Sequence, residues 1–382
     1  MANYRKFLED YGDLTFDEMP FCDVDNIALC QIFYMPLENV LKKGFDEPVD
    51  FTKACYKMYA YNGFKHKGAG LVLLKGMSVN MMSLAACKRY KGIKVVACRD
   101  VYERVPAVQF CAATFLLPNG ETVVMYRGTD DTLVGWKEDV DIFARHGIPS
   151  HKLAADYLEE VCANIEGDVI VTGHSKGGNV ALAAGLLCSD ETRARIKLLY
   201  NNEGPGFDNY DYLTSKAYKE LLPKYRHFIP NIALIGILLA HDFDYTVVKS
   251  SGLFGPLQHD VGTWQVNGTT LVTRDELNKI AQVADVVLHN VIFSSSEDQC
   301  KALDEVLNVC FEMTGCRGLL DFAQNLPTAV KGFVKGWKSF DKTTRSDITG
   351  VFADMGKYTR LAIKDVCHNG LSAKEIILKE TK

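Results

Sequence analysis

The sequence predicts an α/β protein with a mostly parallel sheet, and three observations support that prediction. Short apolar runs alternate with helical segments between about residues 100 and 268, which is the pattern of a sheet with helical connections. One run, Asp168 to Thr172 (DVIVT), has the length and apolar character of a buried parallel strand. A glycine-rich turn and a small-residue helical segment follow it directly. We expect an α/β-hydrolase-type sheet with helical additions at both ends.

The 382 residues exceed what one typical core needs, so we expect one large domain with additions, or two domains. Hydrophobic residues make up 47% of the chain and charged residues 24%, and the net charge is -5. This composition is typical of globular proteins and disfavours intrinsic disorder or a basic nucleic-acid-binding surface. We therefore expect no nucleic-acid partner.

Residues 1–99 are predicted to form a mainly helical part packed on the core. Asp25 to Val40 has helical character with Asp25 as N-cap, and Asn80 to Tyr90 carries apolar residues at helical spacing. The pattern is helical again from about Thr273, for example over Glu297 to Met313. This C-terminal region, residues 269–382, contains no recognisable catalytic motif.

The core, residues 100–268, is predicted to begin with a β-hairpin. Val108 to Leu117 and Thr122 to Tyr126 are β-prone runs separated by Pro118-Asn119-Gly120, and Asn-Gly tolerates the positive φ of a tight turn. Later predicted elements are a helix at 150–165, a helix at 179–188, and strands at 168–172, 196–200, 225–229 and 245–249.

The cysteines and the apolar runs predict a cytoplasmic protein with free thiols. The twelve cysteines are scattered without a CxxC pair, which fits neither a zinc site nor a disulfide framework. Met1 to Gly12 is polar and mixed in charge, unlike a secretory signal. The longest apolar stretch, Ile232 to Ala240, is far shorter than the roughly 20 residues of a membrane span, so we expect none.

Gly173-His174-Ser175-Lys176-Gly177 fits the G-x-S-x-G nucleophile elbow. In that motif a serine sits at a sharp turn between a strand and a helix, and glycines on either side allow close backbone approach. The run before it and the helical segment after it supply the required context. A glycine-rich turn without catalysis is the alternative interpretation.

A serine nucleophile needs a base, and in α/β-hydrolases the chain order is Ser, acid, His. The histidines after Ser175 are His227, His241, His259, His289 and His368. His259 follows the strand at 245–249, where a catalytic histidine is expected, and His241 is the alternative. For the acid we favour Glu203, directly after the strand at 196–200, where the carboxyl ends of the strands meet. Asp208, Asp242 and Asp244 remain open as the acid.

A tetrahedral intermediate also needs hydrogen-bond donors aimed at its oxyanion. The main-chain N–H of Lys176, directly after the nucleophile, is one expected donor. Thr129 is the other, because it follows a strand and offers both an N–H and a hydroxyl. Gly128 to Asp131 is otherwise an ordinary polar turn.

These motifs resemble the class 3 lipase branch of the α/β-hydrolases, in which an aromatic-Arg-Gly-Thr segment with a downstream Trp and Asp precedes GHSxGG. Tyr126 to Thr129, Trp136 and Asp139 match that pattern. A bacterial family of lipase-like proteins is more similar still. Its features occur here in order, from about Asp23 to Val266, as GTDDTLVGWKED (128–139), GHSKGGNVAL (173–182), NNEGPGF (201–207), VVKSSG (247–252) and QHDVGTWQV (258–266).

The resemblance implies an acyl-ester hydrolase with Ser175 as nucleophile, His259 as base, and Thr129 and the Lys176 amide as oxyanion donors. It implies no metal or organic cofactor and a small-molecule ester or lipid as substrate. Secreted class 3 lipases place their acid after the strand that corresponds to 225–229, where this chain has Pro230-Asn231, and the closer family has Asp where this chain has Glu203.

Three functions are therefore compatible with the sequence. Hydrolysis of an ester in the cytoplasm is the leading hypothesis, with Ile232 to Ala240 lining an acyl pocket, forming a lid or forming a core helix. A non-catalytic hydrolase-like binding or scaffold protein is the alternative. Acyl transfer to an acceptor other than water would use the same residues.

Overall fold

The computed structural model describes residues 3–63, 77–130, 132–144, 147–316 and 325–380. Its strands are β1 (Val49–Asp50), β2 (Lys94–Arg104), β3 (Ala107–Leu116), β4 (Thr122–Tyr126), β5 (Val169–His174), β6 (Ile196–Asn202), β7 (Tyr225–Pro230), β8 (Thr246–Val248), β9 (Val266–Asn267), β10 (Thr270–Leu271) and β11 (Thr273–Arg274). Nine of them form one sheet in the order β1-β2-β3-β4-β5-β6-β7-β8-β11, and β9 pairs with β10. β4 to β8 run parallel, whereas β1 to β4 and the β8–β11 pair are antiparallel.

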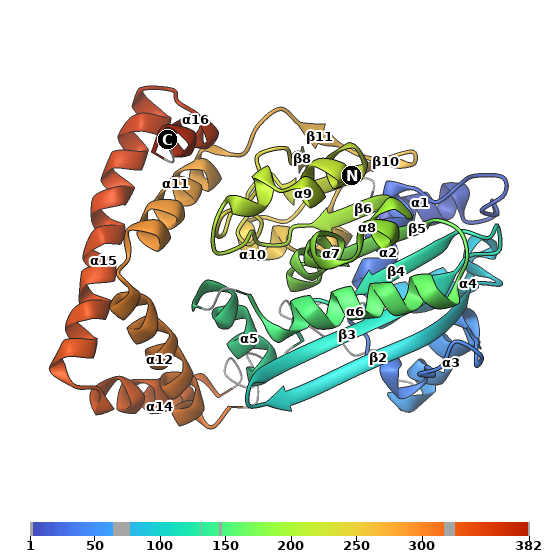
Figure 1. Ribbon diagram of the computed structural model, residues 1–382, viewed down its shortest axis with the longest axis horizontal. Helices are drawn as coiled ribbons and strands as arrows, with labels where there is room; N and C mark the ends of the chain where they lie inside the picture. The colour runs from blue at the N-terminus through green and yellow to red at the C-terminus, as the bar shows by residue number, and fades with distance from the viewer. Residues whose placement is uncertain (1–2, 64–76, 131, 145–146, 317–324, 381–382) are drawn as a thin grey trace.

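The described helices surround this sheet (Figure 1). They are α1 (Tyr4–Tyr11), α2 (Asp23–Ile32), α3 (Phe51–Tyr61), α4 (Met77–Ala86), α5 (Leu133–Ala144), α6 (Pro149–Asn164), α7 (Lys176–Leu187), α8 (Asp190–Ala194), α9 (Lys216–Leu221), α10 (Gly255–Gln258), α11 (Lys279–Ser294), α12 (Glu297–Thr314), α14 (Leu326–Ser339), α15 (Lys342–Ala362) and α16 (Ala373–Glu380). Alternating strands and helices confirm the α/β class.

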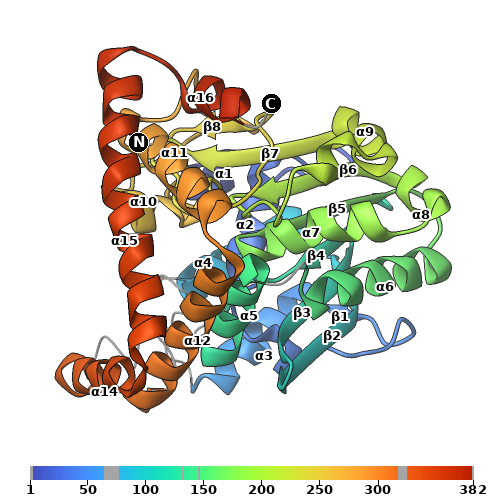
Figure 2. The same ribbon diagram turned by 60° about the vertical axis from the view of Figure 1, so that its left-hand side comes forward.

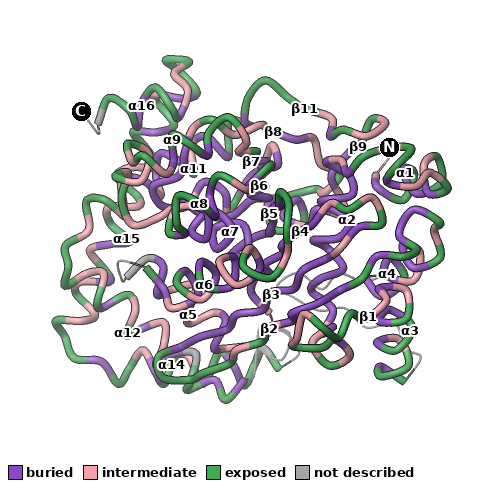
Figure 3. The backbone as a smooth tube through the Cα atoms, turned by 45° about the vertical axis from the view of Figure 1, so that its right-hand side comes forward, coloured by how far each residue is buried: buried purple, intermediate pink, exposed green. Residues whose placement is uncertain are grey.

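Apolar residues on both faces of the sheet are buried under helices. Val123 and Met125 of β4 pack in a core with the N-terminal helices α1 to α4. Val124, between them, packs on the opposite face with α6 and α7. This alternation follows from the two-residue period of a strand, and it explains why the central strands are buried along their length (Figure 3). The result is a sheet between two helical layers.

Two N-terminal predictions are wrong in detail. The chain up to Arg99 is not mainly helical throughout, because β2 begins at Lys94. A bulge at Ala97, with φ of 53°, and the polar outer half of β2 disguise its strand period. In α2, Cys22 rather than Asp25 is the N-cap; Asp25 lies at the third helical position and accepts the Cys22 N–H at 3.1 Å. α2 also ends at Ile32 rather than continuing to Val40. Pro36 disfavours helical geometry at the residue before it, Met35, so the helix cannot continue through this segment.

The predicted hairpin is confirmed as β3 and β4, and the strand predicted at 168–172 is β5, Val169–His174. Helices α11, α12, α14, α15 and α16 lie together along one side of the molecule (Figure 2). They bury apolar residues among themselves, and α11 also packs against the end of β7. All twelve cysteines are free thiols, as predicted. Within the described ranges, none of the helices combines the length and the apolar character needed to cross a bilayer.

Candidate active site

Ser175 lies between the end of β5 and the start of α7, with φ of 59° and ψ of -135°. A positive φ is strained for serine, and the packing of its neighbours enforces it. A Cβ added at Gly173 would lie 2.0 Å from the Gly177 carbonyl oxygen, and one at Gly177 would lie 2.4 Å from the Tyr126 carbonyl oxygen. Only glycine fits at both positions, which explains the spacing of the motif in this chain.

The structure brings His259 and Glu203 together. His259 directly follows α10, and its Nδ1 lies 2.8 Å from Glu203 Oε2. Both side chains are buried. Glu203 Oε1 accepts the main-chain N–H of Leu234 at 3.0 Å and that of Ile235 at 3.4 Å. The Glu203 carboxylate is thus held by His259 through one oxygen and by two main-chain N–H groups through the other. Because Nδ1 of His259 faces Glu203, Nε2 points away from it.

The alternative bases and acids are used elsewhere. His227 Nδ1 lies 2.9 Å from Asp242 Oδ2, and His241 Nε2 lies 3.0 Å from Asp285 Oδ1. Of the remaining candidates, His289 is hydrogen-bonded to Tyr210, and His368 and Asp244 are exposed. Asp208 lies near His151: burial lowers the pKa of His151, and the Asp208 carboxylate acts in the opposite direction. Glu203 is therefore the acid that the geometry favours.

Tyr34, which the sequence did not single out, contacts the elbow. Its hydroxyl lies 2.9 Å from His174 Nδ1 and 3.2 Å from the His174 carbonyl oxygen. Burial raises the pKa of Tyr34 well above its usual value, and the nearby Ser175 side chain acts in the opposite direction. His174 Nε2 lies 2.8 Å from the His259 carbonyl oxygen. A carbonyl only accepts, so His174 Nε2 carries the proton.

The protonation of His174 fixes the direction of this chain of hydrogen bonds. Burial holds the pKa of His174 well below its usual value, so the ring is neutral and Nδ1 accepts the Tyr34 proton. The Tyr34 oxygen is then left as an acceptor that faces the elbow. His259 Nε2 is buried without a hydrogen-bond partner among the described residues. The serine hydroxyl is therefore not hydrogen-bonded to His259 in this structure.

The N-terminal helices hold the elbow from behind. Asn26 of α2 donates to Asn202 Oδ1 at 2.9 Å, and Asn202 Nδ2 donates to the Gly173 carbonyl at 2.9 Å. The carbonyl of Asn202 accepts the Ser175 N–H at 2.9 Å. No local sequence signal identifies Tyr34 or Asn26, because Asn26 lies within α2, Tyr34 lies in the turn that follows it, and both reach the elbow only through the fold.

The loop that carries Thr129 packs directly on the elbow. A Cβ at Gly128 would lie 2.1 Å from the Tyr34 hydroxyl and 2.5 Å from the His174 carbonyl oxygen. Thr129 Oγ1 donates to the Asp139 carboxylate at 2.7 Å. Burial raises the pKa of Asp139 to about 6. Because its hydroxyl is engaged, Thr129 has its main-chain N–H to offer to an oxyanion. Asp131, also in the predicted turn, is outside the described residues.

The amide and the side chain of Lys176 have separate environments. The amide belongs to the first turn of α7, where N–H groups have no acceptor within the helix. The buried ammonium bonds to Glu138 Oε2 at 2.7 Å and to the Gln109 carbonyl and side-chain oxygens at 2.7 and 2.9 Å. Its three donors are therefore used, which leaves the amide as the group available at the site. Glu138 is a further residue that sequence reasoning missed, although it lies inside the segment 128–139.

The stretch Ile232 to Ala240 forms no helix, so the core-helix interpretation is wrong. Side chains satisfy its backbone instead: Ile232 N–H donates to Gln258 Oε1 at 2.9 Å, and the next amides bind Glu203. Leu234 in this loop is exposed, as are Leu253 and Phe254 in the loop before His259.

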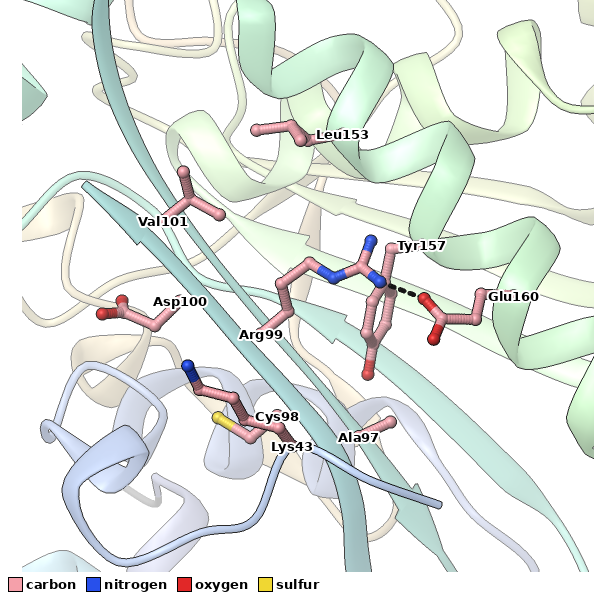
Figure 4. A pocket seen from close by; sticks show the side chains of 9 residues that line it. All are labelled: Lys43, Ala97, Cys98, Arg99, Asp100, Val101, Leu153, Tyr157 and Glu160. Carbon is pink, nitrogen blue, oxygen red and sulfur yellow. Dashed lines mark hydrogen bonds and ion pairs between the residues drawn. The ribbon is translucent and has the colours of Figure 1, made fainter. Parts of the chain in front are cut away.

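A pocket of about 480 Å³ lies away from these residues, between β2 and α6 (Figure 4). Arg99 reaches across it to form an ion pair with Glu160. None of Ser175, His259 and Glu203 lines it, so we do not assign the substrate to it. Among the described residues, no group of three or more His, Cys, Asp or Glu side chains is placed to hold a metal ion.

The parallel sheet and the strained serine at its strand–helix turn, with a buried histidine–carboxylate pair beside it, are the features of lipase-like α/β proteins. The chain belongs to the Mbeg1-like family, a lipase-like family whose model matches residues 84–308, more than half of the chain. No curated protein and no solved structure gives a significant match.

Proposed function

We propose that this protein is a serine carboxylic-ester hydrolase of the α/β-hydrolase type, in the class 3 lipase-like branch. The observation that carries the proposal is the buried His259–Glu203 pair beside the strained Ser175. The free thiols support a cytoplasmic location. We also propose a division into an N-terminal part (1–99), a hydrolase core (100–268) and a helical C-terminal region (269–382).

In the proposed mechanism, the Ser175 hydroxyl turns to His259 Nε2. Ser175 Oγ attacks the ester carbonyl carbon while His259 takes the hydroxyl proton, and the N–H groups of Lys176 and Thr129 stabilise the oxyanion. His259 then protonates the leaving alkoxide, which gives an acyl-enzyme. Water, activated by the same histidine, releases the acid; an alcohol acceptor in its place would give acyl transfer.

Exposed apolar side chains near the acid and base favour an acyl or lipid ester as substrate. Leu234 lies in the loop whose amides bind Glu203, and Leu253 and Phe254 lie in the loop that leads to His259. Leu253 is 84% exposed and Phe254 is 55% exposed. Exposed apolar side chains next to the proposed reaction centre are suited to bind an acyl chain, because binding removes apolar surface from water.

A non-catalytic hydrolase-like protein is the second candidate, favoured by one observation. Among the described residues, His259 Nε2 has no hydrogen-bond partner, so the Ser175 hydroxyl is not paired with its proposed base. If this arrangement were permanent, the hydroxyl would remain unactivated and the site could only bind.

A fluorophosphonate probe separates these two functions because it labels only an activated serine. We expect labelling of the wild-type protein and none of Ser175→Ala. In parallel, p-nitrophenyl esters of increasing acyl length should be hydrolysed with a preference for longer chains if the exposed leucines bind them. An unlabelled wild-type protein that turns over none of the esters would support the non-catalytic candidate. Released acid distinguishes hydrolysis from transfer.

A further inference from the structure

Helix α14 lies outside the part of the chain that matches the family, and its charge differs from that of the whole protein. Its 14 residues, Leu326–Ser339, include Lys331, Lys335 and Lys338 and no acidic residue, in a chain of net charge -5. All three lysines are exposed, and none forms an ion pair within the described part of the chain. With respect to the described residues, the helix therefore presents positive charge without an acidic partner.

One face of α14 is fixed against α12. A Cβ at Gly332 would lie 2.3 Å from the Met313 carbonyl oxygen, and one at Gly336 would lie 2.9 Å from Cys310 Cα. Ala329 is fully buried on the same side. Because two glycines allow this close backbone approach, the rotation of α14 about its own axis is set by packing.

A different face of α14 carries apolar side chains in water. Val330 and Val334, four residues apart and hence neighbours on the helix surface, are 45% and 43% exposed. The exposed lysines lie next to them along the same side. α14 is at a corner of the molecule, remote from β7 and β8, in both ribbon views (Figures 1 and 2).

We propose that this face of α14 docks on an anionic phospholipid surface. Valines at the headgroup boundary lose their contact with water, while lysine stems extend beside them and place the ammonium groups among the lipid phosphates. A nucleic acid would engage the lysines but leave the valines in water, and an apolar protein groove would leave the lysines unpaired. The proposal concerns binding alone and does not rest on ester hydrolysis.

Co-sedimentation of the full chain with vesicles tests this surface. We expect binding to vesicles of phosphatidylcholine mixed with phosphatidylserine at about 0.1 M salt, weaker binding at about 1 M salt, and none to phosphatidylcholine alone. Replacing Lys331, Lys335 and Lys338 together by Gln should weaken binding by roughly 100-fold, because each lysine near an anionic surface contributes about fivefold. Val330→Ser with Val334→Ser should also weaken it.

The matched control replaces three exposed lysines elsewhere, Lys57, Lys91 and Lys219, by Gln. It changes the net charge equally and should bind vesicles nearly as the wild type does. Circular dichroism verifies that each variant folds. Absence of binding to anionic vesicles, or equal losses in the α14 and control variants, would overturn the proposal. Ser175→Ala should bind fully, so failure of the proposed hydrolysis would leave this result standing.

Discussion

Two buried histidine–carboxylate pairs in this molecule have nearly the same geometry and different surroundings. Nδ1 of His259 lies 2.8 Å from Glu203, and Nδ1 of His227 lies 2.9 Å from Asp242. In both rings Nε2 has no partner among the described residues. The ring of His259 stands 4.5 Å from that of His174 at the elbow, whereas His227 lies within β7 and packs between two tyrosines, Tyr225 and Tyr245. The two pairs therefore differ in their neighbours, and only the His259–Glu203 pair lies next to the proposed nucleophile.

Removing the nucleophile should have the largest effect. Ser175→Ala should lower kcat for a p-nitrophenyl ester by about 10⁴- to 10⁶-fold, because the covalent intermediate cannot form. Ser83→Ala, in which the lost hydroxyl bonds only to its own helix, is the control and should leave turnover unchanged. Retained turnover in purified Ser175→Ala would exclude the serine mechanism.

Truncating the two histidines tests the comparison directly. His259→Ala should fall close to the Ser175→Ala floor, because the base is lost and the triad acts as a unit. His227→Ala should keep turnover within a few-fold of wild type but lose about 1–3 kcal/mol of unfolding free energy, since the buried Asp242 loses a partner. Steady-state kinetics and urea unfolding measure both. Equal kinetic losses would remove the distinction between the pairs.

The two carboxylates should differ in the same way. Glu203→Gln should lower kcat by up to about 10⁴-fold, because the amide no longer holds the imidazole in its productive tautomer. Asp242→Asn should leave kcat nearly unchanged. Full activity in Glu203→Gln with a large loss in Asp242→Asn would transfer the role of acid to the later loop.

Tyr34→Phe should have a smaller kinetic effect of opposite sign. Without the competing acceptor, the Ser175 hydroxyl reaches His259 more readily, so kcat should rise by about two- to tenfold, the value of one hydrogen bond. Tyr157→Phe is the matched control, because that buried hydroxyl is bonded to Thr114 at 2.8 Å, away from the elbow; its kcat should not change. A lower kcat in Tyr34→Phe would show that Tyr34 supports the nucleophile.

The smallest expected effect is a pH dependence at His241. Burial lowers the pKa of His241, but the Asp285 carboxylate and further hydrogen bonds outweigh it, so the net pKa is raised. The pair therefore contributes stability that is fully present below the usual histidine pKa and is lost as the pH rises through the raised value. Urea unfolding across this range should show the loss in wild type and little of it in Asp285→Asn. Identical pH profiles of unfolding free energy in wild type and Asp285→Asn would exclude a charged His241–Asp285 pair.

Local sequence features predicted much of the fold. Residues 168–188 show strand, glycine turn and helix in order, and the conformation there depends on neighbours in the chain. β2 was missed because a bulge at Ala97 breaks its alternation. Ile232 to Ala240 was taken for a core helix or a pocket because composition alone cannot reveal that Gln258 and Glu203 satisfy its amides.

The sequence by itself determined the α/β class and the glycine spacing around Ser175, because these depend on strand period and backbone sterics. Only the tertiary structure decided which carboxylate meets His259 and that Tyr34 contacts the elbow at His174, next to Ser175. Tyr34 and Ser175 are 141 positions apart in the chain, and Glu203 and His259 are 56 apart. Contacts over such separations arise from the packing of whole helices on the sheet, which no local pattern of residues encodes.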